Sequence, residues 1–545
     1  MINRLYEEFS KKTSIIEAAD VLKLVTRYNR IQGSRDLWNV VYELKNIVED
    51  RGFDTRIIRI EPGVKQGFIE TPISWNPIKA WIEFKIGDRL IAYLDLLNHP
   101  TLLAGHSPGG EGCSELSICD KPNCRNGAIL ATGYLYDLYL NTDADLIVNY
   151  SEDRYIDAVP YYSLFLEPSD PRNKVVMNIP NRLAIRLRNL INKGEKINVC
   201  WKADVEYSND GLPVLIACRG DSPGPLYVSH ICHPKPGAHD NASGSAANFI
   251  VLSTLSRLSS EFVFNSCHAW VPEYTGTIAL YDKLPWKPIS VVNLDMVGSK
   301  QYITGSTLVV VNPPRFYENI VSSTLWVSIC KVYDTVKSFN NIPEPSIKYS
   351  ISPYTTGSDH DVFITWGINS SMLNEWPSKF YHTDMDDLHT LDYNSIVQIS
   401  IASLISGYLL TKSESKLEIY SKLYESIVRN WYLTQVLKTD YSLNYLNKYL
   451  IKKPLISKHT VDKLMDSPLS SRIIYRILGR EKYFKLSREY SNAFAYLEVY
   501  APLAEKIGIK EHVKHYKAEL LIKWKKSDEK YIVETWNVIK SSLNL

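Results

Sequence analysis

The sequence has no uninterrupted apolar stretch near the roughly 18 residues that a membrane-spanning helix needs. It is 545 residues long but has only eight cysteines, and its formal net charge is only +2. Together with ordinary apolar and charged fractions, these features predict a globular protein and argue against a membrane protein. The N-terminal residues, MINRLYEEFSKKTSII, lack the apolar core of a signal peptide and are typical of an amphipathic helix, so we expect a cytoplasmic protein.

Six of the eight cysteines fall into two groups. Those isolated in apolar runs are expected to be buried thiols, and they are Cys200, Cys218 and Cys330. Cys113, Cys119 and Cys124 lie close together, but their spacing matches no standard zinc finger. We expect loop cysteines or one disulfide there, with a structural zinc site as the alternative.

The character of the chain changes along its length, and a chain this long predicts several domains. Residues 1–65 and 194–412 are expected to form one discontinuous α/β domain. Residues 66–193 contain short strand-like pieces separated by Pro, Gly and Asn clusters, which predicts a mostly β insertion. Residues 413–545 are helical in pattern and predict an all-α C-terminal domain.

Strands and helices alternate regularly between residues 212 and 410, which predicts a mixed central β-sheet flanked by helices. Two of the predicted elements are a strand at 261–267 and a helix at 275–284. Ligands of such sheets bind beyond the carboxyl ends of the strands.

Lys and Arg outnumber Asp and Glu after residue 413. The basic residues are spread along amphipathic faces and form no recognisable reading helix, so we do not expect nucleic acid as a partner. A solvated face or a contact between copies of the chain explains them better.

Histidines and acids recur where predicted strands run into loops of the α/β region. These residues are His230, Asp240, Glu273, Asp295 and His382. A single strand-end histidine is usually a hydrogen-bonded surface residue, and a single Asp usually caps a helix. Five such residues on one sheet instead provide the imidazole and carboxylate ligands of a zinc site with a position left for water.

The segments that carry these residues resemble the zinc aminopeptidase family that includes bacterial leucyl aminopeptidases and glutamate carboxypeptidase II. They are, in chain order, HICHPKPGAHDNASGSA, VPEYTGTIA, VVNLDMVG, GSDHDVF and YHTDMDDL. The resemblance covers roughly residues 1–410, and the insertion looks like the protease-associated domain of many members. It implies a zinc exopeptidase fold with two zinc ions that share an aspartate and a water molecule.

The resemblance implies roles for individual residues. His230 and Asp295 resemble ligands of one zinc, His382 resembles a ligand of the other, and Asp240 resembles the bridging carboxylate. Gly237 is expected to permit the tight turn that brings Asp240 to the edge of the sheet, and Gly244 the close packing of the following helix.

The sequence departs from the family where two adjacent glutamates normally precede a glycine. Here Glu273 occupies the position of the general base, and Tyr274 occupies that of a ligand of the second metal. A phenol must lose a proton with a pKa of about 10 to bind a metal well, so we expect a weak or altered second site. The alternatives to Tyr274 are His233, His239 and Asp384.

Three further positions lie in or beside these segments. Cys232 stands where relatives have an aspartate that orients the histidine ligand. His360 resembles a residue beside the site, and Asp386 is expected to anchor the loop that holds His382 or to cap the following helix.

These features predict a metallo-aminopeptidase that hydrolyses short peptides with zinc, and with Co²⁺ or Mn²⁺ as alternatives since the same ligands accept them. Glu273 would act as the general base. The alternative is a peptide- or partner-binding protein on a degenerate peptidase fold with one zinc or none, which the missing glutamate favours.

Overall fold

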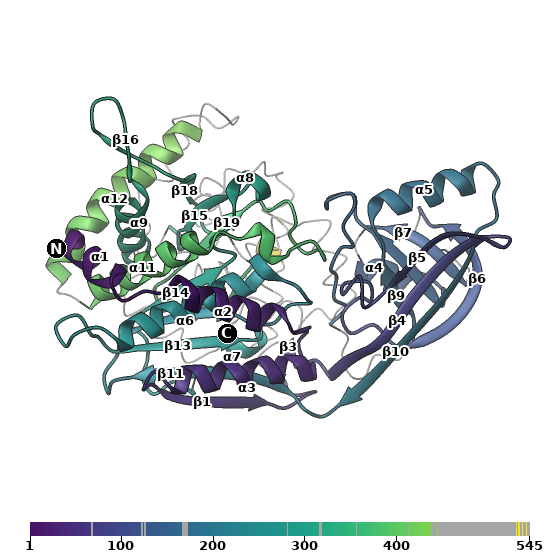
Figure 1. The fold of residues 1–545 in the computed structure, drawn as a ribbon, viewed down its shortest axis with the longest axis horizontal. Coiled ribbons are helices and arrows are strands. Elements are labelled where there is room, and N and C mark those ends of the chain that lie inside the picture. Colours follow the sequence, from purple (N-terminus) through teal and green to yellow (C-terminus); the bar gives the residue numbers. More distant parts are fainter. Residues whose placement is uncertain are drawn as a thin grey trace.

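The computed structural model describes residues 1–435, except 67–68, 121–123, 125–126, 134, 166–172, 281, 316–318, 356 and 412–413, together with isolated positions further on. The predicted C-terminal domain therefore lies largely outside the described residues. Within them the chain forms two lobes, each with its own β-sheet (Figure 1).

The larger lobe is built on an eight-stranded mixed sheet with the order β1-β11-β13-β12-β14-β19-β15-β18. The strands are β1 (Asp54–Ile60), β11 (Leu212–Arg219), β12 (Pro225–His230), β13 (Ser266–Val271), β14 (Ser290–Asp295), β15 (Thr307–Val311), β18 (Tyr349–Ser352) and β19 (Ser370–Trp376). The central strands β13, β12, β14 and β19 run parallel to their neighbours in this group. Their side chains are almost all buried, which explains why these segments are apolar without alternation.

A helical layer more than one helix deep packs on the sheet. It contains α1 (Ile2–Ser10), α2 (Ile15–Thr26), α3 (Arg35–Glu49), α6 (Ser243–Ser256), α9 (Ile320–Tyr333), α11 (Tyr393–Leu410) and α12 (Glu414–Gln435). Helix α6 lies between the strands β12, β13 and β14 on one side and α2 and α11 on the other, so it is buried on nearly every face. Helix α11 has the length and composition of a membrane-spanning helix, but 78% of it is buried inside the protein, as in a core helix.

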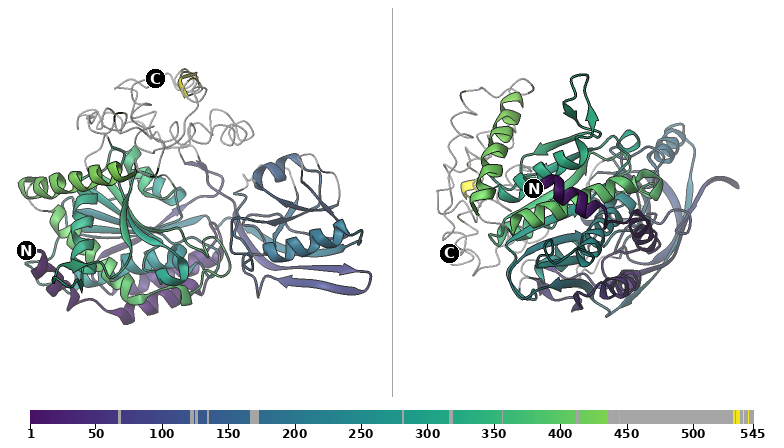
Figure 2. Two further views of the ribbon diagram at one scale, coloured as in Figure 1. Left: turned by 90° about the horizontal axis from the view of Figure 1, so that it is seen from above. Right: turned by 60° about the vertical axis from the view of Figure 1, so that its left-hand side comes forward.

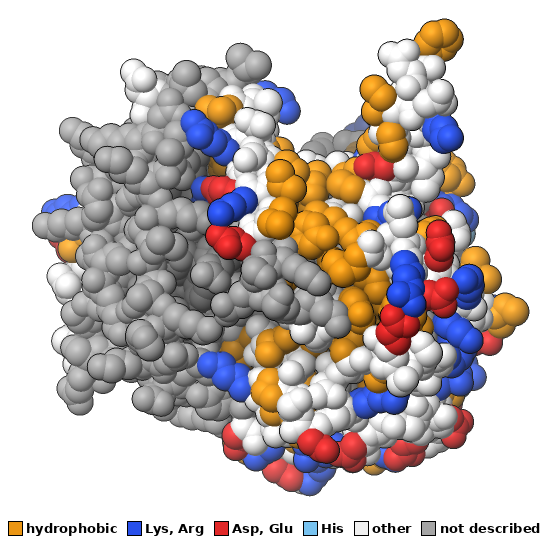
Figure 3. Space-filling model, turned by 90° about the vertical axis from the view of Figure 1, so that its left-hand side faces the viewer, with side chains coloured by type: hydrophobic (Ala, Val, Ile, Leu, Met, Phe, Trp, Pro, Cys, Tyr) orange, Lys and Arg blue, Asp and Glu red, His pale blue; other side chains and the backbone are white. Residues whose placement is uncertain are grey.

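Short elements complete this lobe. They are the helical turns α7 (Thr275–Ile278), α8 (Gln301–Thr304), α10 (His360–Thr365), η1 (Ala238–Ala242) and η2 (Leu388–Thr390), and the hairpins β2–β3 (Lys65–Gln66, Ile69–Glu70) and β16–β17 (Val336–Lys337, Pro343–Glu344). Figure 3 looks onto the end of the molecule that carries α12 and the β16–β17 hairpin, where apolar side chains gather. The exposed ones include Phe339 of the hairpin and Ile419 and Leu423 of α12.

The smaller lobe is the insertion, and it forms a seven-stranded sheet with the order β5-β4-β10-β6-β7-β8-β9. Its elements are β4 (Ser74–Ile86), β5 (Arg89–Asp95), β6 (Gly110–Ile118), β7 (Ala128–Thr132), β8 (Leu146–Tyr150), β9 (Val175–Asn178), β10 (Asn198–Ser208), α4 (Leu135–Asn141) and α5 (Asn181–Asn192). The long strands β4 and β10 connect it to the larger lobe (Figures 1 and 2). Strand β10 thus belongs to the smaller sheet, although the sequence analysis grouped residues 198–208 with the α/β domain.

Six of the eight cysteines form disulfides, which corrects the prediction of buried thiols at Cys200 and Cys218. Cys200 on β10 is bonded to its cross-strand partner Cys113 on β6. Cys218 on β11 is bonded in the same way to Cys267 on β13. The third disulfide joins Cys119 and Cys124, so two of the three clustered cysteines pair with each other. The pairing of the two cross-strand disulfides depends on strand register, which no local pattern of residues discloses, whereas the Cys119–Cys124 disulfide is the local one allowed for in the sequence analysis.

Candidate metal centre and active site

Three of the predicted ligands meet at the carboxyl ends of β12 and β14. These strands are parallel neighbours, so His230 and Asp295, their last residues, lie at the same edge of the sheet. Asp240 in η1 approaches both: Nε2 of His230 is 3.1 Å from Oδ1 of Asp240 and 3.5 Å from Oδ1 of Asp295. We call this buried group the first cluster.

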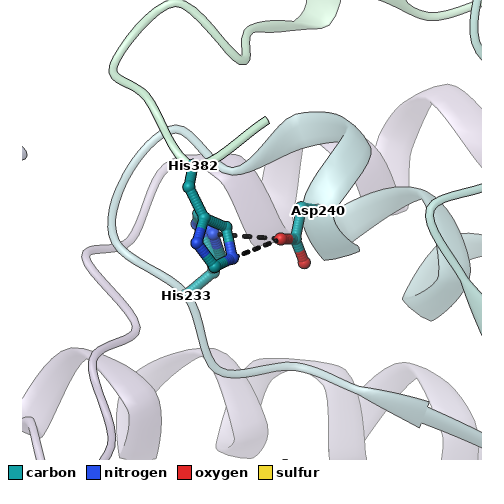
Figure 4. Close-up of side chains that lie close together, drawn as sticks. All are labelled: His233, Asp240 and His382. Carbon is teal, nitrogen blue, oxygen red and sulfur yellow. Dashed lines mark ion pairs between the residues drawn. The ribbon is translucent and has the colours of Figure 1, made fainter. Parts of the chain in front are cut away.

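A second cluster lies on the other oxygen of the same aspartate. Nε2 of His382 is 3.1 Å from Oδ2 of Asp240, and Nε2 of His233 is 3.4 Å from it. Figure 4 shows the two imidazoles side by side, both pointing at this carboxylate. Asp240 thus contributes one oxygen to each cluster, and either set of three donors can hold a metal ion.

Backbone carbonyls orient the histidines of the loop after β12. The carbonyl oxygen of Cys232 is 3.1 Å from Nδ1 of His230, and that of Pro234 is 2.9 Å from Nδ1 of His233. A carbonyl only accepts, so each Nδ1 carries the proton and each Nε2 keeps its lone pair for a metal. The carbonyl of Cys232 thus orients His230, the role that the sequence resemblance led us to expect of an aspartate side chain at this position.

The loop that carries Asp240 is fixed by one buried carboxylate and one buried cation. Asp386 accepts hydrogen bonds from the backbone N–H groups of His239 and Asp240, at 3.0 and 2.9 Å. Arg30 donates to the carbonyls of Ile231 and Gly237, at 2.8 and 3.1 Å. The sequence analysis named Asp386 and missed Arg30, because only the fold brings it to this loop.

Two glycines permit this arrangement, as the sequence analysis expected. Gly237 has a φ of +51° at the start of η1, in the left-handed region that favours glycine. A Cβ at Gly244 would lie 2.1 Å from the carbonyl oxygen of Leu294, so only glycine lets the helix approach β14 this closely.

Glu273 lies just after β13, beside both clusters. Burial raises the pKa of its carboxyl well above the usual value; nearby His230 opposes this shift, and the carboxylate of Asp295 adds to it. Its backbone N–H donates to the Sγ atom of Cys232 at 3.1 Å, which fixes its position relative to the His230 loop. A carboxyl whose affinity for a proton is raised in this way can take up a proton and pass it on.

Within the clusters, the pKa of His230 is raised and the pKa of Asp240 is lowered. Burial alone would lower the pKa of His230, but the carboxylates of Asp295, Glu273 and Asp240 outweigh it and raise that pKa well above its usual value. Burial alone would raise the pKa of Asp240, but the three histidines around it hold that pKa well below its usual range. Asp240 therefore remains a carboxylate, as a bridging ligand must.

Tyr274 and His360 belong to neither cluster. The Tyr274 hydroxyl donates to Oδ2 of Asp361 at 2.5 Å, and the His360 ring bonds to the carbonyl of Thr355 at 2.9 Å. The remaining alternatives to Tyr274 also lie elsewhere, because Nε2 of His239 faces Glu375 at 3.5 Å and Asp384 bonds to His99 at 2.7 Å. Among the alternatives considered from the sequence, the structure brings only His233 into the second cluster.

The insertion reaches the second cluster through residues that sequence reasoning missed. The ring of Tyr161 packs against the rings of His233 and His382, with centroids 4.9 and 5.1 Å apart, and its backbone N–H donates to the carbonyl of His382. The adjoining Tyr381 stacks on His382 at 3.7 Å. No local motif marks Tyr161, since its position depends on how the two lobes pack.

Comparisons with known proteins agree with this architecture. Residues 202–405 match the family model of peptidase family M28, which supports an M28-type peptidase fold for this part of the chain. A search of curated proteins gave no match. The stretch 202–405 contains all the members of both clusters as well as Glu273.

Solved structures are similar in fold at low sequence identity. The chain is similar to a zinc aminopeptidase from Bacillus subtilis, with 16% identity, a TM-score of 0.51 and coverage of 73% of this chain and 96% of that one. It is also similar to a peptidase M28 precursor from Shewanella amazonensis, with 11% identity, a TM-score of 0.54 and coverage of 76% of this chain and 96% of that one. A putative peptidase from Clostridium acetobutylicum has 14% identity and a TM-score of 0.52, with coverage of 75% of this chain and 83% of that one. The fold is thus that of the zinc exopeptidases, a mixed central sheet flanked by helices, as the sequence predicted.

Proposed function

We propose that this protein is a zinc-dependent aminopeptidase that hydrolyses the N-terminal residue from short peptides. The observation that carries the proposal is the pair of clusters that share Asp240, with Glu273 beside them. The match to peptidase family M28 and the fold of the Bacillus subtilis zinc aminopeptidase support it.

The donor atoms of both clusters suit zinc, which prefers imidazole nitrogen and carboxylate oxygen in sets of three with one position open. Nε2 of His233 is buried and has no hydrogen-bond partner, as expected of a ligand atom. We infer that His230, Asp240 and Asp295 hold one zinc ion and that His233, Asp240 and His382 hold a second. His233 would then supply the ligand that Tyr274 cannot.

When bound, zinc would lower the pKa of water toward about 7 and polarise the peptide carbonyl. Glu273 would take a proton from the attacking water and deliver it to the nitrogen of the leaving amine. The hydrogen bond from the backbone N–H of Glu273 to Sγ of Cys232 fixes the backbone from which this carboxyl extends. Burial raises the pKa of this carboxyl, which strengthens it as a proton acceptor in the first transfer.

The Glu273→Gln variant tests this function. We expect the turnover of leucyl-p-nitroanilide to fall by about 10²–10⁴-fold, the usual contribution of a general base, while the zinc content stays unchanged. Asp387→Asn, an exposed helix cap on the His382 side of the fold, is the matched control. Unchanged turnover in Glu273→Gln, or peptide binding without turnover by the zinc-loaded wild type, would contradict the proposal and favour the binding protein.

A further inference from the structure

Arg154 of the insertion is a partly buried cation without a partner. It makes no hydrogen bond or ion pair with any residue that the structure describes, and its Nε atom is buried without an acceptor. Arg219 of the larger lobe is also partly buried without an ion pair and lies over the Phe53 ring, but four other partly buried arginines each have a carboxylate partner. These pairs are Arg51 and Arg257 with Glu17, Arg188 with Asp120, and Arg315 with Glu425.

The position of Arg154 relates it to the candidate active site. Its guanidinium carbon lies 5.0 Å from the centre of the Tyr381 ring, and Tyr381 in turn stacks on His382 at 3.7 Å. Only one aromatic ring therefore separates the cation from a member of the second cluster.

The surroundings hold Arg154 at this place. Its segment is joined to the His382 loop by a β-bridge between Pro160 and Thr383 and by a hydrogen bond of 2.9 Å from the N–H of Val159 to Asp384. The contact with the Tyr381 ring fixes the guanidinium by a cation–π interaction. A guanidinium fixed in advance loses little side-chain entropy when it forms two parallel hydrogen bonds to a carboxylate.

Arg154 is a fixed cation without a counter-ion, and the nearby cluster would gain positive charge when it binds metal. The repulsion between these charges is unfavourable unless an anion lies between them. Among the described residues no carboxylate forms an ion pair with Arg154. A ligand that carries a carboxylate would supply the missing negative charge.

We propose that Arg154 binds the terminal carboxylate of the peptide substrate and thereby selects di- and tripeptides. This inference rests on the proposed function, because it places the scissile carbonyl at the two clusters. An extended residue spans about 3.5 Å, so the carboxylate of a peptide cleaved at its first bond lies one or two residues further on. An acidic side chain at the second residue presents the same chemistry and is distinguished by experiment.

Hydrolysis of matched substrates by the zinc-loaded full chain tests the proposal. The substrates are leucylglycine, leucylglycinamide, the α-amide of leucylaspartic acid, and leucyl-p-nitroanilide. We expect the wild type to prefer leucylglycine over its amide by about 10- to 100-fold in kcat/KM, the value of a charge-assisted pair. Arg154→Gln should abolish this preference through KM and leave the amide and the anilide unchanged. Arg154→Lys should restore it in part, and Arg186→Gln, an exposed arginine of the insertion, should behave as wild type.

Three results would overturn the proposal. The first is equal turnover of leucylglycine and its amide by the wild type. The second is an equal loss on all four substrates in Arg154→Gln, which is the signature of a structural role. The third is a stronger Arg154-dependent preference for the leucylaspartic α-amide than for leucylglycine, which would place an acidic side chain at Arg154 instead.

Equilibrium binding of the same probes to the Glu273→Gln variant separates this inference from the peptidase function. Titration calorimetry should show leucylglycine binding about 10- to 100-fold more tightly than leucylglycinamide, and the added Arg154→Gln substitution should remove the difference. Carboxylate-dependent binding without any turnover by the wild type would overturn the peptidase function and support the carboxylate site. Equal binding of acid and amide would overturn the site alone.

Discussion

The two clusters share one aspartate but rest on different kinds of structure. His230 and Asp295 of the first cluster end two adjacent core strands, and the His230 side chain is only 4% exposed. His233 and His382 of the second cluster lie on loops, and the His382 side chain is 30% exposed. The first cluster is therefore fixed by the sheet, whereas the second depends on contacts between loops and on the insertion.

This difference explains where the chain departs from the family pattern that its sequence resembles. A ligand at a strand end is tied to the register of the whole sheet, so exchanging it would require the sheet to change. A loop ligand can be exchanged for a neighbour with the right reach. Tyr274 hydrogen-bonds to Asp361, whereas His233 lies against Asp240 on the second cluster.

Removal of the shared carboxylate should have the largest effect on metal binding, because Asp240 contributes an oxygen atom to both clusters. In Asp240→Ala we expect the zinc content to fall from two ions to near zero and the activity to fall to that of metal-free protein. Elemental analysis of the purified protein and a peptidase assay measure this. Retention of one full zinc equivalent would mean that the aspartate does not bridge.

A substitution in the second cluster alone should weaken one metal site and leave the other unchanged. In His233→Ala we expect the affinity of one zinc ion to fall by more than the roughly 100-fold that loss of an outer partner costs, with the other ion unchanged. Competition with a chelator during zinc titration measures both affinities, and the absorption spectrum of the Co²⁺-loaded protein reports the lost nitrogen ligand.

Tyr274→Phe is the matched control for this experiment. Its hydroxyl serves Asp361, so both metal affinities should remain as in the wild type. If Tyr274→Phe loses a metal and His233→Ala does not, the assignment of His233 to the second metal is wrong.

A smaller effect is expected from the contact that ties the second cluster to the insertion. Asp384 accepts hydrogen bonds from the N–H of Val159 at 2.9 Å and from His99 at 2.7 Å. In Asp384→Asn one oxygen becomes an amide NH₂ that cannot accept, so the His382 loop loses a partner. We expect the affinity of the second metal to fall about tenfold and that of the first to stay the same, in the same chelator titration. An equal fall at both centres would show that the insertion supports the whole site.

Several features were predictable from the sequence because local patterns determine them. Buried parallel strands are continuous apolar runs, and the residues that end them, such as His230 and Asp295, are visible at once. The details were less accurate near β13, where the strand was predicted at 261–267 and is found at Ser266–Val271. The helix predicted at 275–284 is described only over Thr275–Ile278, because apolar side chains alone do not show where a short helical turn ends.

The sequence by itself determined the mixed α/β fold and the donor residues at the strand ends, since each depends on residue type and near neighbours. Only the tertiary structure decided that His233 lies with Asp240 and His382, that Cys218 pairs with Cys267, and that Arg154 of the smaller lobe lies over the ring of Tyr381. These contacts join residues far apart in the chain, and whether they form depends on strand register and on the packing of the two lobes, which no local pattern encodes.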